Sequence, residues 1–210
     1  MENGRILLAD DHPLIREGLK MAIGIRHPKL IVDSVESVAA AEALARTQNG
    51  YRLLLLDYQL RDVEGYSGFF RMLHLLGKTP IAIISAHDHP SIITAARAVG
   101  AAGFLSKSEP LDMMVQSIDR LLDGKTVFPP VPDNSASLKE LHDRLQSLSA
   151  AQMRVLNALA KGHLNKQIAA DLDVSEATVK AHMTAVFRKL GVNNRVQAVL
   201  TVRPLFDPET

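Results

Sequence analysis

The chain has 210 residues, of which 47% are hydrophobic and 22% are charged, a composition typical of a globular protein with one or two domains. It contains no cysteine, which excludes disulfides, thiolate zinc sites and cysteine nucleophiles. No apolar run approaches the ~18 residues of a membrane span, and the opening MENGRILLADD has no signal-peptide core. We therefore expect a cytoplasmic protein without membrane insertion.

The net charge of +1 conceals a difference between two parts of the chain. Residues 1–124 carry 13 Lys and Arg against 15 Asp and Glu, a net charge of −2. Residues 149–203 carry eight against three, a net charge of +5. Short segments fluctuate by a few charges, so the basic part is a weak indication of a polyanionic partner.

The first 124 residues alternate short apolar runs with amphipathic segments. The apolar runs predict strands at 5–10, 29–35, 52–57, 80–86 and 101–107. The amphipathic segments predict helices near 13–26, 38–48, 65–76, 90–99 and 110–123. Strands buried on both faces have unbroken apolar runs such as LLLL, and right-handed crossovers leave few topologies for five such units. We therefore predict an α/β doubly wound parallel sheet of five strands.

Charged and hydroxylic side chains come at the ends of these runs, namely at Asp10, Asp11, Asp57, Ser85 and Lys107. Parallel strands end at one edge of a sheet, so these groups should share a pocket. Carboxylates packed together need a cation, and an all-oxygen ligand set suits Mg²⁺. The pattern predicts that Asp57 attacks a phosphoryl group that Lys107 and Ser85 also contact. For any one of these groups alone, a cap of the following helix is the favoured explanation; the coincidence of all five favours the site.

Four segments, LLADDHPLIREGL, LLLLDYQLRDVEG, IISAHD and GFLSKSEP, resemble the hallmark segments of bacterial response-regulator receiver domains over residues 4–124. The resemblance implies the strand order 2-1-3-4-5 and a phosphoacceptor at Asp57. It implies a Mg²⁺ site formed by Asp10, Asp11, Asp57 and the backbone carbonyl of Gln59. It further implies that Lys107 is the invariant-type lysine of the family and that Ser85 is the switch hydroxyl. Phe104 is then the aromatic switch, which turns inward on phosphorylation.

Two features of this region depart from the family pattern or leave a property open. Arg61 stands four residues after the phosphoacceptor position, where family members usually have proline, so the geometry of that loop is not predicted. Gln59 and His87 occupy positions that tune acyl-phosphate lifetime in the family, and that lifetime is not assigned. His87 and His89 have no third ligand nearby, which favours a polar loop over a transition-metal site.

Residues 125–147 are predicted to be a linker, because GKTVFPPVPDNSAS is rich in Pro, Gly and Ser, with a helix near 138–148. From Ser149 the pattern is helical, and NKQIAADLDVSEATVKAHMTAVFRKLG has the outline of a helix-turn-helix with Ser175 as the cap of its second helix. One face is predicted to be core and comprises Ile168, Ala169, Leu172, Val174, Val179, Met183, Val186 and Leu190. The opposite face carries Thr178, Lys180, Ala181, Thr184, Arg188 and Lys189, although a solvated amphipathic helix explains this outline equally well.

Residues 148–199 resemble the LuxR-type four-helix DNA-binding domain, chiefly through NKQIA, SEATVKAH and RKLGVNNR, and we predict that the domain spans 148–203. The resemblance implies that 175–190 is the recognition helix and that 193–202 is a dimerisation helix. It implies base-facing positions at Lys180, Ala181 and Thr184, and contacts to the DNA backbone at Lys166, Thr178 and Arg188. Asp173 stands in the turn where relatives often have glycine, and Asp tolerates the left-handed conformation better than most residues.

Together these features predict a NarL/FixJ-type response regulator of a two-component system: a regulator rather than an enzyme, phosphorylated by a sensor histidine kinase and binding double-stranded operator DNA as a homodimer. One alternative is an atypical regulator of the same fold that needs no phosphorylation. A second, an aspartyl phosphatase or phosphotransfer enzyme, is disfavoured because Gln59 replaces the second Asp of an Asp-x-Asp pair. A third, a dinucleotide-binding enzyme, is disfavoured because no G-x-G-x-x-G follows the first strand.

Overall fold

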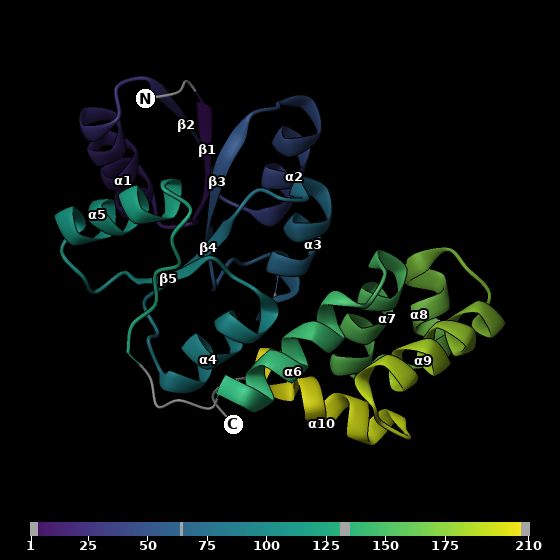
Figure 1. Cartoon of the computed structure of the whole chain (residues 1–210). Coiled ribbons are helices and arrows are strands. Elements are labelled where there is room, and N and C mark those ends of the chain that lie inside the picture. The colour runs from purple at the N-terminus through teal and green to yellow at the C-terminus, as the bar shows by residue number, and fades with distance from the viewer. Residues whose placement is uncertain (1–3, 64, 131–134, 207–210) are drawn as a thin grey trace. The chain divides into compact units, whose positions relative to one another are not determined.

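The computed structural model describes residues 4–63, 65–130 and 135–206 (Figure 1). The chain divides into two compact units, Met1–Pro132 and Asp133–Thr210. Among the described residues, no helix combines the length and the apolar character that crossing a membrane requires.

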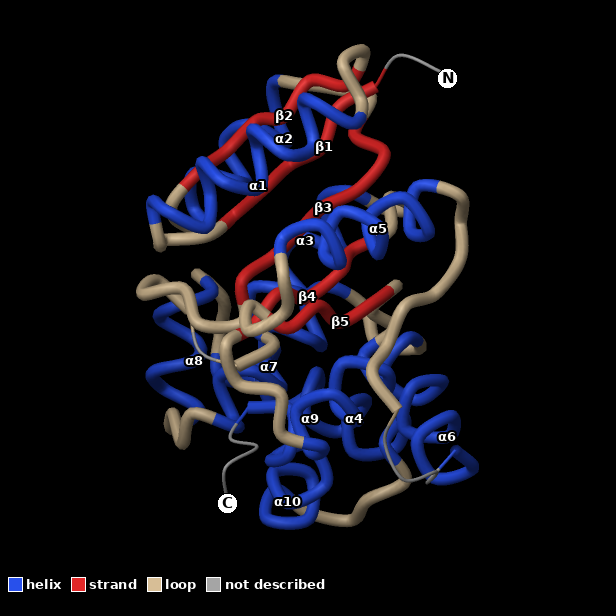
Figure 2. Tube along the Cα trace, turned by 90° about the vertical axis from the view of Figure 1, so that its left-hand side faces the viewer, coloured by secondary structure: helices blue, strands red, loops and turns tan. Residues whose placement is uncertain are grey.

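The first unit is a five-stranded parallel sheet in the order β2-β1-β3-β4-β5, seen as red segments in Figure 2. Its strands are β1 (Gly4–Ala9), β2 (Leu30–Val35), β3 (Tyr51–Asp57), β4 (Ile81–Ser85) and β5 (Gly103–Ser106). Its helices are α1 (Pro13–Arg26), α2 (Val38–Thr47), α3 (Ser67–Leu76), α4 (Pro90–Val99) and α5 (Leu111–Leu122). In Figure 1, α1 and α5 pack together on one face of the sheet, and α2 and α3 pack together on the other. The predicted fold and strand order are confirmed.

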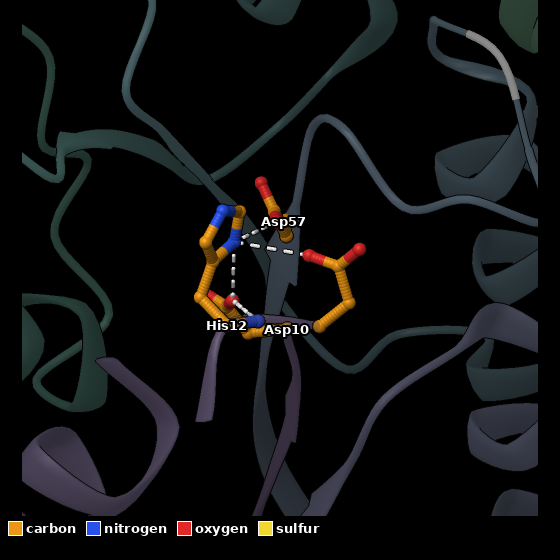
Figure 3. A group of neighbouring side chains, drawn as sticks. Asp10, His12 and Asp57 are labelled. Atoms are coloured by element: carbon orange, nitrogen blue, oxygen red, sulfur yellow. Dashed lines mark hydrogen bonds and ion pairs between the residues drawn. The ribbon is translucent and has the colours of Figure 1, made fainter. Parts of the chain in front are cut away.

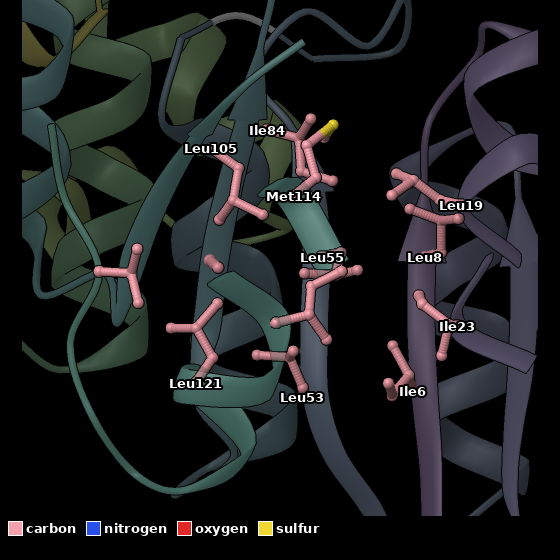
Figure 4. Close-up of a cluster of buried hydrophobic side chains, with 13 residues drawn as sticks. Ile6, Leu8, Leu19, Ile23, Leu53, Leu55, Ile84, Leu105, Met114 and Leu121 are labelled. Atoms are coloured by element: carbon pink, nitrogen blue, oxygen red, sulfur yellow. The ribbon is translucent and has the colours of Figure 1, made fainter. Parts of the chain in front are cut away.

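The run of four leucines is explained by the position of β3 in the middle of the sheet. Leu53 and Leu55 lie in a cluster with side chains of β1, α1 and α5 (Figure 4). Leu54 and Leu56 alternate with them and are also buried, because helices cover the other face as well. Burying each leucine contributes about 1.5–3 kcal/mol, so this strand holds its last residue in a fixed position.

The segment after α5 returns to the edge of the sheet. The backbone N–H of Phe104 donates to the Val127 carbonyl at 2.8 Å, and the Val127 N–H donates to the Ala102 carbonyl at 3.1 Å. The guanidinium of Arg97 lies 4.7 Å from the centre of the Phe128 ring. These contacts pair backbone groups that an edge strand would otherwise leave open. Part of the predicted linker therefore belongs structurally to the first unit.

The second unit is all helical, with α6 (Ser135–Gln146), α7 (Ala150–Ala160), α8 (Asn165–Leu172), α9 (Glu176–Leu190) and α10 (Arg195–Phe206). Val155 and Leu159 of α7 pack with Ile168 of α8 and Val179 of α9 in a small core. Helix α6 packs on α9, where Arg144 donates to the Leu190 carbonyl. The predicted linker thus also contributes to this unit, and the predicted domain boundaries stay predictions.

The turn between α8 and α9 supports the helix-turn-helix outline. Asp173 has a φ of 52° and is the one non-glycine with positive φ in the described part of the chain. The hydroxyl of Ser175 accepts a hydrogen bond from the Thr178 N–H, as predicted for the cap of α9. The prediction that Val174 is core is wrong, because 38% of this residue is exposed. The burial of Val174 was inferred from helical spacing. That spacing does not extend past Asp173, because its left-handed backbone ends the helix.

Candidate functional site

The carboxyl edge of the sheet brings together residues that are far apart in the sequence. Asp57 is the last residue of β3 and Ser85 is the last of β4, while Asp10 follows β1 and Lys107 follows β5. Asp10, Asp57 and Ser85 are buried. Parallel strands place their ends at one edge, and the apolar runs before them hold the backbone there.

Lys107 is the cation at the centre of this cluster. Its buried Nζ lies 2.7 Å from Oδ2 of Asp57 and 2.9 Å from Oδ2 of Asp10. Burial raises the pKa of Asp57, and the hydrogen bond from Lys107 opposes that effect by favouring the ionised carboxylate. The backbone N–H of Gln59 donates to the other Asp57 oxygen at 3.2 Å. Asp57 is therefore held in one orientation by two donors.

His12 also belongs to the cluster, although the sequence analysis gave it no role (Figure 3). Its Nδ1 lies 3.0 Å from Oδ1 of Asp11, 3.3 Å from Oδ1 of Asp10 and 3.8 Å from Oδ2 of Asp57. The signal for it was its place directly after the acidic pair. Because 62% of its side chain is exposed, His12 can leave the carboxylates without disturbing the core.

The same carboxylates fit a divalent cation. Ligand atoms of Asp10, Asp11, His12 and Asp57 lie within 4.8 Å of one another. Oδ2 of Asp10 and Oδ1 of Asp11 are buried and make no hydrogen bond, although Lys107 and His12 lie at ion-pair distance from them. Buried oxygens with unused lone pairs are what a hard ion such as Mg²⁺ requires.

The predicted switch residues lie beside this site. The Ser85 hydroxyl accepts a hydrogen bond from the His87 N–H at 2.9 Å, which leaves its own proton available. Phe104 is only 2% exposed, so its ring is already buried in this conformation. The predicted inward turn would need a conformation in which the ring is exposed. At the end of β5, the Ser106 hydroxyl donates to Asp88 at 3.2 Å and ties β5 to the β4–α4 loop.

The outer face of α9 and the start of α8 carry the predicted DNA contacts. Lys166, Lys180, Ala181, Thr184 and Arg188 are exposed, and Thr178 is half-buried. The Thr184 hydroxyl donates to the Lys180 carbonyl at 3.0 Å, one turn earlier in the same helix.

Lys189 stands apart from these residues, although the sequence places it on the same face of the helix. Its Nζ donates to the Ser147 carbonyl at 2.6 Å and to the Gln152 side chain at 2.8 Å. This lysine therefore supports the fold of the second unit.

Comparison with known proteins assigns both units. Residues 6–119 match the family model described as response regulator receiver domain, and residues 146–202 match that of bacterial regulatory proteins of the luxR family. The chain belongs to the two-component transcriptional response regulators. Its receiver and its LuxR-type DNA-binding domain are the two units described above.

Two curated relatives and one solved structure place this response regulator more closely. It is 35% identical to the glycerol metabolism activator of Pseudomonas putida, over 94% of both chains. It is 33% identical to the probable transcriptional regulatory protein NarL of Mycobacterium tuberculosis, over 94% of this chain and 93% of the relative. The RcsB response regulator of Salmonella typhimurium has a similar fold, with a TM-score of 0.56 at 20% identity over 97% of this chain and 99% of RcsB.

Proposed function

We propose that a sensor histidine kinase transfers a phosphoryl group to Asp57 of this response regulator, and that the phosphorylated chain binds operator DNA as a homodimer. The observation that carries the proposal is the buried carboxylate of Asp57, held by Lys107 beside two carboxylate oxygens without hydrogen bonds. In this proposal Asp10, Asp11, Asp57 and the Gln59 carbonyl hold Mg²⁺. The chain then acts as a regulator and not as an enzyme on an external substrate.

The Lys107 ammonium and the Gln59 N–H orient the Asp57 carboxylate for the proposed phosphotransfer step. A bound Mg²⁺ would neutralise charge on the phosphoryl oxygens. Asp57 attacks phosphorus through one carboxylate oxygen, a P–O bond forms, and the P–N bond to the kinase histidine breaks with the electron pair leaving on nitrogen. Lys107 loses its pairing with the ionised carboxylate and can pair with a phosphoryl oxygen instead, so the ammonium stays partnered throughout.

Ser85 is proposed to respond to the new group. Its hydroxyl already accepts from His87, so its free proton can be donated to a phosphoryl oxygen. Movement of the β4–α4 loop would change the surface near β4, α4 and β5 and the packing around Phe104, which is buried in this conformation. Phosphorylation would then shift the population of receiver conformations and thereby favour dimerisation on DNA.

The second unit supplies the proposed DNA-binding surface. Lys180, Ala181 and Thr184 would face bases, and Lys166, Thr178 and Arg188 would contact the DNA backbone. Two apolar side chains one turn apart on α10, Val196 and Leu200, are 65% and 58% exposed. This exposed apolar pair supports α10 as the surface that a second copy covers on a two-half-site operator.

Intact mass spectrometry tests the phosphorylation part of the proposal. The protein and its Asp57→Ala variant are incubated with Mg²⁺ and acetyl phosphate. We expect a single labile phosphoryl adduct on the parent and none on the variant. A parent protein that stays unmodified with acetyl phosphate and with a panel of kinases would instead support the phosphorylation-independent regulator.

A further inference from the structure

Arg61 stands at the outer side of the proposed metal site. Its Nε lies 3.0 Å from Oδ2 of Asp11, and 89% of its side chain is exposed, whereas the Asp11 side chain is largely buried. Oδ1 of the same carboxylate faces His12 and has no hydrogen bond. One proposed metal ligand is therefore already shared between two side chains of the protein.

The loop that carries Arg61 is anchored on both sides of it. Before it, the Gln59 N–H is bonded to Asp57. After it, the Asp62 carboxylate accepts the N–H groups of Val38 at 3.1 Å and Ala39 at 2.9 Å, at the start of α2. With its backbone anchored on both sides, the guanidinium can reach Asp11 with little loss of backbone entropy.

We infer that Arg61 is a positioning residue that competes with the divalent ion for Asp11, and so lowers the affinity of this site for metal. The inference rests on the proposed function, because it concerns the metal that phosphoryl transfer to Asp57 would need. The guanidinium holds Oδ2 of Asp11 while the metal is absent and is displaced toward solvent when the ion binds.

The size of the effect follows from charge and exposure. The Arg61 guanidinium brings a positive charge to the same carboxylate that the ion would use. An exposed ion pair is weak, which makes Arg61 a displaceable competitor and not a block. Removing it should therefore tighten divalent-ion binding by about twofold to fivefold.

The test is a titration of the full-length, unphosphorylated protein with Mn²⁺, followed by electron paramagnetic resonance of the free ion, with Mg²⁺ as competitor. Arg61→Ala is compared with the parent protein, with Arg61→Lys and with Arg46→Ala. Arg46 is an exposed arginine in the last turn of α2, so its replacement removes the same charge from the opposite end of that helix. Because Arg61 is exposed, we expect Arg61→Ala to fold like the parent, and circular dichroism checks this.

We expect Arg61→Ala to lower the Kd for Mn²⁺ by about twofold to fivefold, Arg61→Lys to fall between it and the parent, and Arg46→Ala to match the parent. Binding by the parent with an equal or higher Kd in Arg61→Ala would contradict this inference alone. Two other results would contradict the proposed metal site itself: a parent protein that binds neither ion, and an Asp57→Ala variant that binds the ions with the same Kd as the parent.

Discussion

The two units of this response regulator place their functional groups in opposite environments. In the receiver, Asp57, Asp10 and Lys107 are buried and paired with one another. On α9, Lys180 and Arg188 are exposed, and neither contributes to the small core of the DNA-binding unit. Changes in the receiver site should therefore alter stability together with function, while changes on α9 should alter DNA binding alone.

The largest effect on stability is expected from Lys107→Ala. This change leaves the buried carboxylates of Asp10 and Asp57 without their cation, and breaking a buried pair in this way costs about 3–5 kcal/mol. Urea unfolding without divalent ions measures the change. Arg61→Ala, which breaks an exposed pair to Asp11, should cost no more than about 1 kcal/mol. Equal losses in the two variants would contradict the difference in burial on which the comparison rests.

A smaller loss of stability is expected from Gly103→Ala at the edge of the receiver sheet. A Cβ at this position would lie 2.8 Å from the Val127 carbonyl oxygen and 3.0 Å from a methyl of Leu121. Forcing the extra carbon into this packed contact should cost about 1–3 kcal/mol. Gly24→Ala is the matched control, because it lies in α1 with nothing within 4 Å and should stabilise the helix by about 0.5–1 kcal/mol. Equal effects of the two changes on urea unfolding would show that the return of Val127 to β5 is not tightly packed.

A pH-dependent difference is expected for Asp57→Asn. The pKa of Asp57 is raised in the folded receiver, chiefly by burial, so the ionised carboxylate disfavours the fold and the protonated form does not. In the absence of divalent ions, the variant should therefore be more stable than the parent at pH 7. The difference should shrink as the pH falls through the raised pKa, and vanish below the ordinary value of 3.8. Urea unfolding across this range measures it, and a constant difference would mean that the ionisation of Asp57 is not its source.

The smallest change in stability is expected from Arg188→Ala on α9. This exposed side chain should contribute less than about 0.5 kcal/mol to folding. If it contacts a phosphate, the variant should bind all DNA sequences more weakly, and the slope of log K against log salt should fall by about 1. Lys180→Ala should instead change sequence preference. An unchanged salt slope for Arg188→Ala would exclude the phosphate contact.

The sheet and the strand-end cluster could be predicted because each depends on a local pattern. Apolar runs and helical periodicity define the strands and helices, and the carboxyl ends of parallel strands must meet at one edge. The pattern therefore predicts that Asp10, Asp57 and Lys107 lie close together, as they do in the structure. Their chemical roles, and those of the predicted DNA contacts, stay predictions.

Contacts between loops could not be predicted in the same way. Arg61 reaches Asp11 across 50 positions of sequence, and its reach depends on how the two loops are anchored. The pairing of Val127 with the edge of β5 could not be predicted, because Val127 lies in a segment with the composition of a linker. Neither contact leaves a periodic signal, because each is fixed by the packing of the completed sheet.

Control of DNA binding by Asp57 is tested most directly by the affinity of the full-length protein for its operator before and after phosphorylation. An operator fragment selected from random DNA is titrated with the untreated protein, with protein treated with acetyl phosphate and Mg²⁺, and with Asp57→Ala treated in the same way. We expect tighter binding and dimer formation for the treated parent alone. Equal affinity in all three samples would show that Asp57 does not control the DNA-binding unit, and would favour a regulator that acts without phosphorylation.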